Sequence, residues 1–153
     1  MIFRDATRAD LPVVVQMLAA DQLGATRETV TEPIADAYVA AFERIDADPN
    51  NRLIVADDNG QVVGCLQLTY IPGLTFSGGI RAEIEGVRVH QRVRGQGVGH
   101  KMIRWSIDEA KRHGCRLVQL TTNNVRKDAQ RFYLDLGFVA SHVGMKLDLR
   151  DAK

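Results

Sequence analysis

The sequence predicts an α/β fold, because segments typical of strands alternate with segments of helical periodicity along its 153 residues. In the middle of the chain two apolar runs flank Asp58-Asn59-Gly60, a turn signal typical of an antiparallel hairpin. In the second half a helix pattern follows a strand pattern twice. This length suits one domain with one hydrophobic core, so we expect residues 1–153 to form a single domain.

The first half of the chain is expected to contain two helices. Asp10 stands where it could cap the first helix, in which apolar residues recur every three to four positions. Pro33 suits the first turn of the second helix, which should continue to Ile45. Strands are expected over residues 2–5, 52–56, 62–70 and 80–90.

The second half is expected to continue with helices and short strands. A long amphipathic helix is predicted over residues 97–113, and a strand follows it over residues 117–121. Asp128 is predicted to cap a short helix over residues 129–136. Residues 138–149 have the pattern of one or two closing strands.

Composition and charge exclude several classes of protein. The 20 Lys and Arg residues nearly balance the 19 Asp and Glu residues, so we expect no nucleic-acid partner. No apolar run reaches the roughly 18 residues of a membrane span, and the N-terminal residues lack the apolar core of a signal peptide. We therefore expect a cytoplasmic protein without a membrane partner. Cys65 and Cys115 are expected to be buried thiols, and no metal site is predicted.

A glycine-rich turn is the most informative part of the sequence. Three glycines alternate in Arg94-Gly95-Gln96-Gly97-Val98-Gly99, between a predicted strand and a predicted helix. Glycines at the start of a helix leave backbone N–H groups accessible, which favours binding of phosphate oxygens. Arg92 and Lys101 add positive charge, and no carboxylate occurs between Glu85 and Asp108. The turn is therefore predicted to bind a polyanion.

Two other phosphate-binding motifs fit this turn poorly. A Walker A loop needs a hydroxyl residue directly after its lysine, and Lys101 is followed by Met102. A dinucleotide-binding fingerprint needs different glycine spacing within an early parallel unit, whereas a predicted antiparallel hairpin precedes this turn.

The turn fits the pattern Q/R-x-x-G-x-G/A, and it resembles the coenzyme A pyrophosphate loop of the GNAT superfamily of N-acetyltransferases. A second stretch, residues 129–138, is similar to the late A-x-x-F-Y-x-x-x-G-F helix of that superfamily. The order of the predicted elements also matches along essentially the whole chain. The resemblance implies a GNAT-type fold, with a mixed, mostly antiparallel sheet flanked by helices.

The resemblance also implies binding of acetyl-coenzyme A as the acyl donor. It assigns the pairing of pantetheine to the backbone of Val87 and Val89, and a further pantetheine contact to Asn124 or to its neighbour Asn123. The residues that would wrap the pyrophosphate are Arg94, Gly95, Gln96, Gly97, Val98 and Gly99. His100 and Arg126 depart from the usual residues of the family at their positions.

Three residues are candidates for catalysis of acetyl transfer. Tyr133 stands where the superfamily commonly places a tyrosine near the acyl-bearing sulfur, and a phenol of pKa about 10 could protonate a departing thiolate. Glu85 and Glu83 share one face of a predicted strand if no bulge intervenes, and either could accept the proton of the acceptor amine. Glu85 is the first choice, because this position is often acidic in the superfamily. We expect direct attack of the amine without a nucleophilic cysteine.

The acceptor is expected to be a primary amine of a small molecule, because residues 23–31 and 70–79 are long enough to cover a pocket. Residues 121–133 are locally similar to aminoalkylphosphonate N-acetyltransferases, which act on small zwitterionic amines. The alternatives are a non-catalytic acyl-coenzyme A binding or regulatory module, a protein N-acetyltransferase, and a nucleotide-phosphate binder. A homodimer is expected, because the closing segment offers an aliphatic surface formed by Val139, Val143, Met145 and Leu147.

Overall fold

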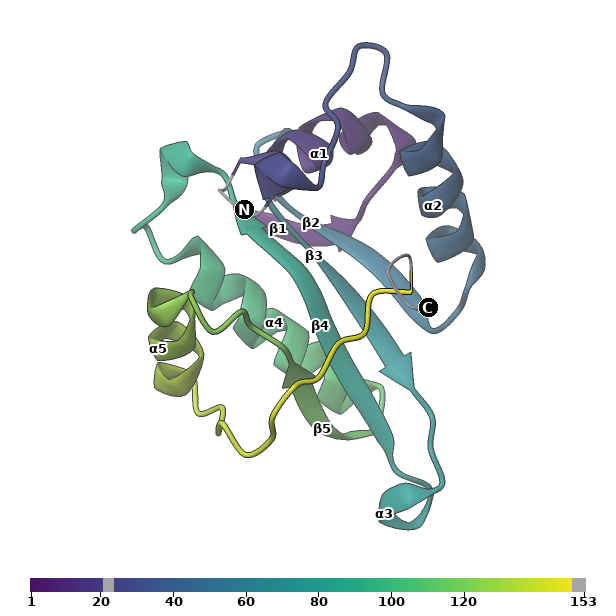
Figure 1. The fold of residues 1–153 in the computed structure, drawn as a ribbon, viewed down its shortest axis with the longest axis vertical. Helices are drawn as coiled ribbons and strands as arrows, with labels where there is room; N and C mark the ends of the chain where they lie inside the picture. The colour runs from purple at the N-terminus through teal and green to yellow at the C-terminus, as the bar shows by residue number, and fades with distance from the viewer. Residues whose placement is uncertain (21–23, 150–153) are drawn as a thin grey trace. The chain divides into compact units, whose positions relative to one another are not determined.

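The computed structural model describes residues 1–20 and 24–149. The chain divides into two compact units, residues 1–120 and residues 121–153. Figure 1 labels the helices and strands along the chain. Among the described residues, the first unit holds all strands of the sheet and most of the helices, and the second unit holds one helix and the segment that follows it.

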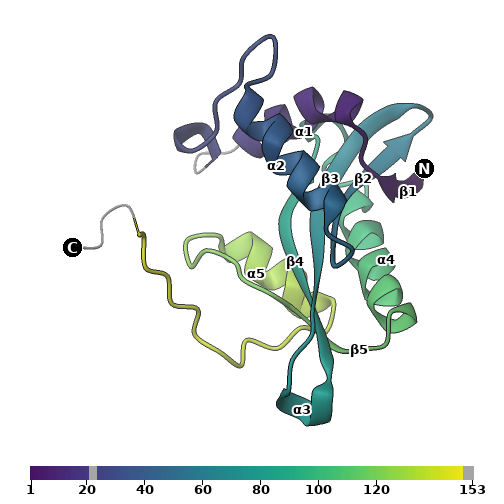
Figure 2. The ribbon, with the colours of Figure 1, turned by 90° about the vertical axis from the view of Figure 1, so that its right-hand side faces the viewer.

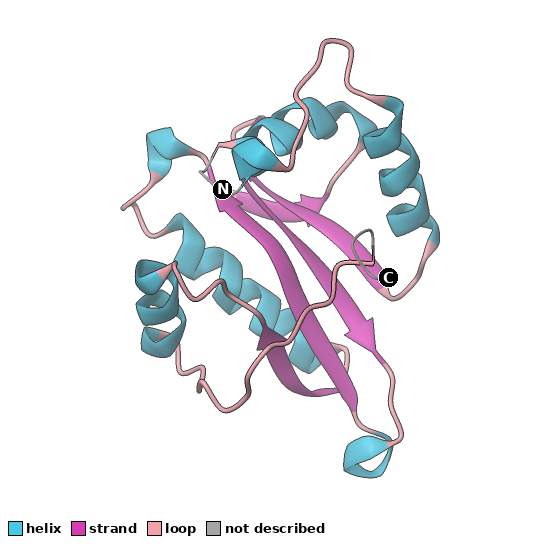
Figure 3. Ribbon diagram, in the orientation of Figure 1, coloured by secondary structure: helices cyan, strands magenta, loops and turns pink. Residues whose placement is uncertain are grey.

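The first unit is built on a five-stranded sheet in the order β1-β2-β3-β4-β5 (Figure 3). The strands are β1 (Ile2–Asp5), β2 (Asn51–Asp58), β3 (Gln61–Ile71), β4 (Ile80–Val89) and β5 (Cys115–Leu120). The pairs from β1 to β4 are antiparallel, and β5 runs parallel to β4. The expected mixed, mostly antiparallel sheet is therefore confirmed.

The hairpin between β2 and β3 forms at the predicted turn. Asn59 and Gly60 both have positive φ, 54° and 82°, which is the backbone conformation that tight two-residue hairpins require. The Asp57 carboxylate accepts the Gly60 N–H at 2.7 Å and closes the turn.

Helices cover both faces of the sheet (Figure 2). On one face lie α1 (Leu11–Ala19), which packs on β3 and β4, and α2 (Asp36–Ala47), which packs on β2. On the other face α4 (Val98–Arg112) packs on β3, β4 and β5. The single turn α3 (Thr75–Gly78) joins β3 to β4.

Alternation along the strands divides the core between the two faces. Val55 and Cys65 point toward α1, where they pack with Val14 and Met17. The neighbouring positions Ile54, Leu66, Leu68 and Ile84 point to the opposite face, and all four are fully buried. The buried residues of α4 recur at helical spacing and are Val98, Met102, Ile103, Ser106 and Ala110.

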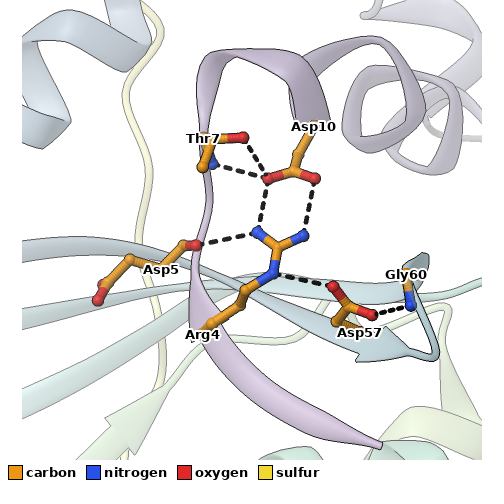
Figure 4. A network of polar contacts seen from close by, with 6 residues as sticks. All are labelled: Arg4, Asp5, Thr7, Asp10, Asp57 and Gly60. Atoms are coloured by element: carbon orange, nitrogen blue, oxygen red, sulfur yellow. Dashed lines mark hydrogen bonds and ion pairs between the residues drawn. The ribbon is translucent and has the colours of Figure 1, made fainter.

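Arg4 on β1 links three parts of the first unit (Figure 4). Its guanidinium donates to both oxygens of Asp10, at 2.8 and 3.1 Å, and to Asp57 at 2.9 Å. Asp10 also accepts the backbone N–H of Thr7 at 2.7 Å. The Arg4 hydrogen bonds are the main cause that lowers the pKa of Asp10 to about 2.

The predicted start of α1 is confirmed but its predicted cap does not form, and α2 begins a few residues later than predicted. Asp10 stands at the N-cap position of α1, but its carboxylate binds Thr7 and Arg4 and does not cap α1. Pro33 lies before α2, because Ala35 is still extended (φ −62°, ψ 138°) and the helix begins at Asp36.

The second unit contains the helix α5 (Lys127–Asp135). Asp128 does not cap this helix as predicted; Arg126 is at the N-cap, and Asp128 pairs with Arg131 one turn later. After α5, Gly137 has a φ of 92° and ends the helix as expected.

The prediction of closing strands over residues 138–149 is wrong for the described structure. This segment forms neither helix nor strand, although apolar side chains alternate along its second half. The apolar side chains are 76% to 92% exposed; they are Val139, Val143, Met145, Leu147 and Leu149. A strand needs a neighbour for its backbone groups, and the strand pairs of the described residues leave this segment out.

Candidate functional site

The β5-facing edge of β4 is paired only along part of its length. The last paired row joins Ile84 to Leu120, and β4 continues to Val89. Within the described first unit no strand pairs with this edge of β4 over residues 85–89, and we call this part the open edge of β4. A ligand that carries amide groups could pair there as an added strand does.

A bulge in β4 prepares the open edge. Gly86 and Val87 lie opposite the single residue Leu66, and Gly86 has a φ of 60°. Beyond the bulge, the N–H of His90 bonds to the carbonyl of Val63 on β3 at 2.9 Å. Alternate residues of a strand direct their backbone groups to opposite sides, so the backbone groups of Val89 face the open edge.

Arginine side chains already contact the carbonyls of this edge. Arg88 Nη1 donates to the carbonyl of Val87 at 2.9 Å, and Arg94 Nε donates to the carbonyl of Val89 at 3.2 Å. Val87 and Val89, to which the resemblance assigns pantetheine, therefore have carbonyls that accept hydrogen bonds from arginine side chains, and a ligand pairing with these carbonyls would have to replace those bonds.

The glycine-rich loop leads from the end of β4 to the start of α4. A short 3₁₀ turn, η3 (Gln91–Val93), precedes it, and Gly95 and Gly97 both have a φ of 76°. Gly97 is the N-cap of α4, and it has no side chain that could cap the N–H groups of the first turn. Val98 is buried and fixes the helix on the sheet. The helix N-terminus therefore presents its N–H groups and the positive end of its dipole to an anion.

The charges around the loop favour an anion as well. Arg92 and Arg94 are exposed, and the first turn of α4 contains no acidic residue. Gln96 Nε2 donates to the carbonyl of Arg92 at 3.2 Å, which holds the loop in a compact turn. A Cβ at Gly95 or Gly97 would meet no atom within 4 Å, so these glycines are required by their positive φ rather than by a close neighbour.

Glu83 and Glu85 lie on one face of β4, as the sequence predicted. The register with β3 is continuous from Glu83 to Glu85, and the bulge comes after them. Both point to the face that carries α1 and α2, since Glu85 lies opposite Gln67 and Glu83 opposite Thr69. Glu83 is half-buried and Glu85 is exposed.

Four polar residues form a row across the sheet that sequence reasoning missed. Asn51, Thr69, Glu83 and Gln119 stand opposite one another on β2, β3, β4 and β5, and we call them the polar row. Gln119 Nε2 donates to Glu83 Oε2, and Thr69 Oγ1 donates to Asn51 Oδ1 at 2.7 Å. Polar residues alternate in the sequence of β3 and of β4, which was an available signal, but only the strand register brings the four residues together.

The second unit holds the remaining predicted residues. Tyr133 on α5 meets Phe132 and Phe138 edge to face, with ring centroids 5.0 and 5.8 Å away. Asn123 and Asn124 are both exposed, and Asn123 Oδ1 accepts the N–H of Val125 at 3.0 Å and so supports a turn. The side-chain oxygen of Asn123 is therefore already used within the chain.

The two cysteines differ in burial but not in chemical character. Cys65 is buried as expected, and burial raises its pKa to about 12. Cys115 is only half-buried, which corrects the prediction, and partial burial raises its pKa too. Neither thiol is activated as a nucleophile.

The first unit also contains a small cavity. A cavity of about 190 Å³ lies between α1 and the segment before α2, lined by Pro12, Val15, Gln16, Val30, Thr31, Glu32 and Ile34. Part of the predicted acceptor segment contributes to it, while Leu23, its first residue, lies outside the described residues. Within residues 1–20 and 24–149, no group of three His, Cys, Asp or Glu side chains could hold a metal ion. No helix among the described residues is long and apolar enough to cross a membrane.

Solved structures reproduce the fold of this chain. A crystal structure described as a transcriptional regulator from Bacillus halodurans C-125 has 50% sequence identity and a TM-score of 0.94, over 97% of this chain and 99% of that chain. A structure from Agrobacterium tumefaciens str. C58, provisionally named an acetyltransferase, has 28% identity and a TM-score of 0.86 over the same shares, 97% and 99%.

Sequence comparisons identify the family. The aminoalkylphosphonate N-acetyltransferase of Salmonella typhimurium is 39% identical over 95 residues, which are 62% of this chain and 61% of that protein. The match thus spans less than two thirds of this relative. The model of the acetyltransferase (GNAT) family matches residues 17–138, which include the glycine-rich loop, both glutamates and Tyr133. The chain therefore belongs to the GNAT family of acetyltransferases.

Proposed function

We propose that this protein transfers the acetyl group of acetyl-coenzyme A to a primary amine of a small molecule. One observation carries the proposal: an uncapped, positively charged helix N-terminus follows the open edge of β4 directly along the chain. Backbone amides at a strand edge and an anion site next to it match a ligand that joins an amide-bearing arm to a pyrophosphate.

The residues present fit such a donor. The N–H groups at the start of α4 and the loop Arg94–Gly99 would hold the pyrophosphate, and Val87 and Val89 would pair with the pantetheine amides. Asn124 is the proposed further pantetheine contact. The expectation that residues 1–153 act as a single domain is part of this proposal. The bound donor supplies an activated acetyl thioester.

The proton transfers are assigned to side chains of this chain. A lysine-like amine of pKa about 10.4 is protonated at neutral pH and must lose a proton before it can attack. Glu83 or Glu85 accepts this proton and releases it to water. Tyr133 gives its phenolic proton to the departing sulfur and regains one, through solvent, from the nitrogen that forms the amide. Direct attack agrees with two cysteines whose pKa values burial raises.

The small-molecule acceptor rests on two further observations. The cavity beside α1 combines an apolar wall with the carboxylate of Glu32 and the amide of Gln16, groups that suit a small polar amine. The Salmonella relative is named for aminoalkylphosphonates, so a small amine that carries an anionic group is the first acceptor to test.

A thiol-release assay tests the proposed function. Acetyl-coenzyme A is incubated with the protein and a panel of amines, including aminoalkylphosphonates, amino sugars and a lysine peptide. Amine-dependent release of free thiol, with an acetylated small amine found by mass spectrometry, supports the proposal. A higher kcat/KM on the peptide than on every small amine would indicate a protein acetyltransferase instead.

A non-catalytic regulator is the second candidate function. It is favoured by the structure from Bacillus halodurans, which is described as a transcriptional regulator and shares half of its aligned residues with this chain. Such a module would bind acyl-coenzyme A and release no thiol with any amine in the panel, so the same assay separates the two functions.

We also propose that the protein is a homodimer. The C-terminal segment alternates apolar and polar residues from Val143 to Leu149, a pattern that suits a strand with one buried face. Its apolar side chains are exposed in the single chain, and a second copy could cover them.

A further inference from the structure

The two candidate bases have different surroundings on the sheet. Glu83 belongs to the polar row and has a strand on each side, with Thr69 opposite it on β3 and Gln119 on β5. Glu85 has Gln67 opposite it on β3, but it lies beyond the last row that pairs β4 with β5. Only Glu83 therefore has a neighbour on the β5 side within the paired sheet of residues 1–120.

Hydrogen bonds on β3 increase this difference. Thr69 and Gln67 both donate to the Asn51 side chain on β2, at 2.7 and 3.0 Å. Their donor groups therefore turn away from β4 and toward β2. Gln119 instead donates its amide to Glu83 Oε2 from the other side. The asymmetry leaves one carboxylate held in place and the other exposed to solvent.

The hydrogen bond from Gln119 favours Glu83 as a proton acceptor. Gln119 holds one carboxylate oxygen, so the rotation of the Glu83 side chain is restricted while Oε1 can still accept a proton. A group already held in a productive orientation loses less entropy in the reaction than an exposed, rotating side chain. Glu83 is also half-buried, which reduces the competition of water for its charge.

We propose that Gln119 is a positioning residue that orients Glu83 as the base for the acceptor amine, and that this contact selects Glu83 over Glu85. The inference rests on the proposed acetyltransferase function. In the step, the acceptor ammonium gives its proton to Glu83 Oε1, and the freed electron pair of nitrogen attacks the acetyl carbon. Gln119 touches neither the amine nor the donor and acts only through Glu83.

A double-mutant cycle tests this assignment. Gln119→Leu keeps most of the side-chain volume and removes the donor, so kcat/KM for the amine should fall about tenfold or more and the acidic limb of the pH profile should move to higher pH. The KM for acetyl-coenzyme A should stay within about twofold. Glu83→Gln should lower kcat/KM for the amine at least as much, and the double variant Glu83→Gln/Gln119→Leu should have the same kcat/KM as Glu83→Gln alone. The matched control is Gln61→Leu, an exposed glutamine at the hairpin end of β3, which should change neither quantity.

A readout without substrates examines the contact itself. In spectra of the free protein, the Gln119 side-chain amide resonance should shift in Glu83→Ala and stay unchanged in Glu85→Ala. Equal activity and equal pH profiles for Gln119→Leu and Gln61→Leu would overturn the assignment while the proposed function stands. The assignment would also be overturned if the double variant lost kcat/KM by the sum of the two single losses, expressed as free energies. A wild-type protein that releases no thiol with any amine would overturn the proposed function, and the assignment with it.

Discussion

At the scale of single residues, the Arg4–Asp10 pair makes the stability of the first unit depend on pH. Arg4 lowers the pKa of Asp10 to about 2, below its ordinary value of about 3.9. A carboxyl group with a lowered pKa contributes its stability above the ordinary value, and this contribution is lost as the pH falls toward 2.

We therefore predict that the free energy of unfolding falls by on the order of 2 kcal/mol between pH 5 and about pH 2 through this group. Urea denaturation at a series of pH values measures it. Asp10→Asn should be less stable than wild type at pH 7 and show a flatter pH dependence in the acidic range. Parallel curves for the two proteins would show that Asp10 does not carry this effect.

Tyr133 is the second residue whose role can be separated from its packing. Tyr133→Phe keeps the ring that meets Phe132 and Phe138 and removes only the hydroxyl. We predict that kcat falls about 100-fold, because a positioned general acid is lost, while the dissociation constant of acetyl-coenzyme A hardly changes. Steady-state kinetics and calorimetry of the same variant provide both values. An unchanged kcat would leave Tyr133 as part of the aromatic packing only.

A site residue can be predicted from the sequence when neighbouring residues determine its position. It cannot be predicted in this way when its position depends on the register of two strands. The loop Arg94–Gly99 and the shared face of Glu83 and Glu85 follow from local pattern, and the structure has both. Gln119 is an ordinary polar strand residue in the sequence. Its position beside Glu83 depends on the register of two parallel strands, β4 and β5, which are far apart in the sequence and joined through α4.

At the scale of elements, the start of α4 connects backbone conformation to binding. Gly97 has a φ of 76° with open space around it, so an alanine there is strained by its backbone and not by a clash. We predict that Gly97→Ala lowers stability by about 1 kcal/mol and weakens binding of acetyl-coenzyme A about tenfold, as the loss of one hydrogen bond to a charged group would.

Gly60→Ala is the matched control for this prediction. Gly60 has a similar φ, 82°, and similar open space, but it lies in the β2–β3 hairpin. It should lose comparable stability and keep its affinity for acetyl-coenzyme A. If both variants bind as the wild type does, the N-terminus of α4 is not the pyrophosphate site.

Some helices and strands could be predicted from sequence patterns alone. The hairpin and α4 were predicted within one or two residues, because turn residues and helical periodicity act locally. The start of α2 was placed too early, since Pro33 is compatible with a first turn but does not compel one. Residues 138–149 were predicted as strands from alternation alone, and alternation does not supply a neighbouring strand.

At the scale of the whole molecule, the C-terminal segment leads to a prediction about assembly. If a second copy covers its apolar residues, light scattering at micromolar concentration should give twice the mass of the 17.0 kDa chain. Met145→Lys should then give the single-chain mass, because it places a charge among those residues. Lys146→Gln, on the neighbouring polar position, should leave the dimer intact. A single-chain mass for the wild type would refute the dimer.

The proposed function depends on binding of acetyl-coenzyme A, and titration calorimetry of the free protein tests this binding most directly. The protein is titrated separately with acetyl-coenzyme A, NAD and ATP under one set of conditions. We predict saturable heat with one site per chain for acetyl-coenzyme A and no comparable binding of the other two. Absence of heat with acetyl-coenzyme A, or tighter binding of NAD or ATP, would contradict the proposed function.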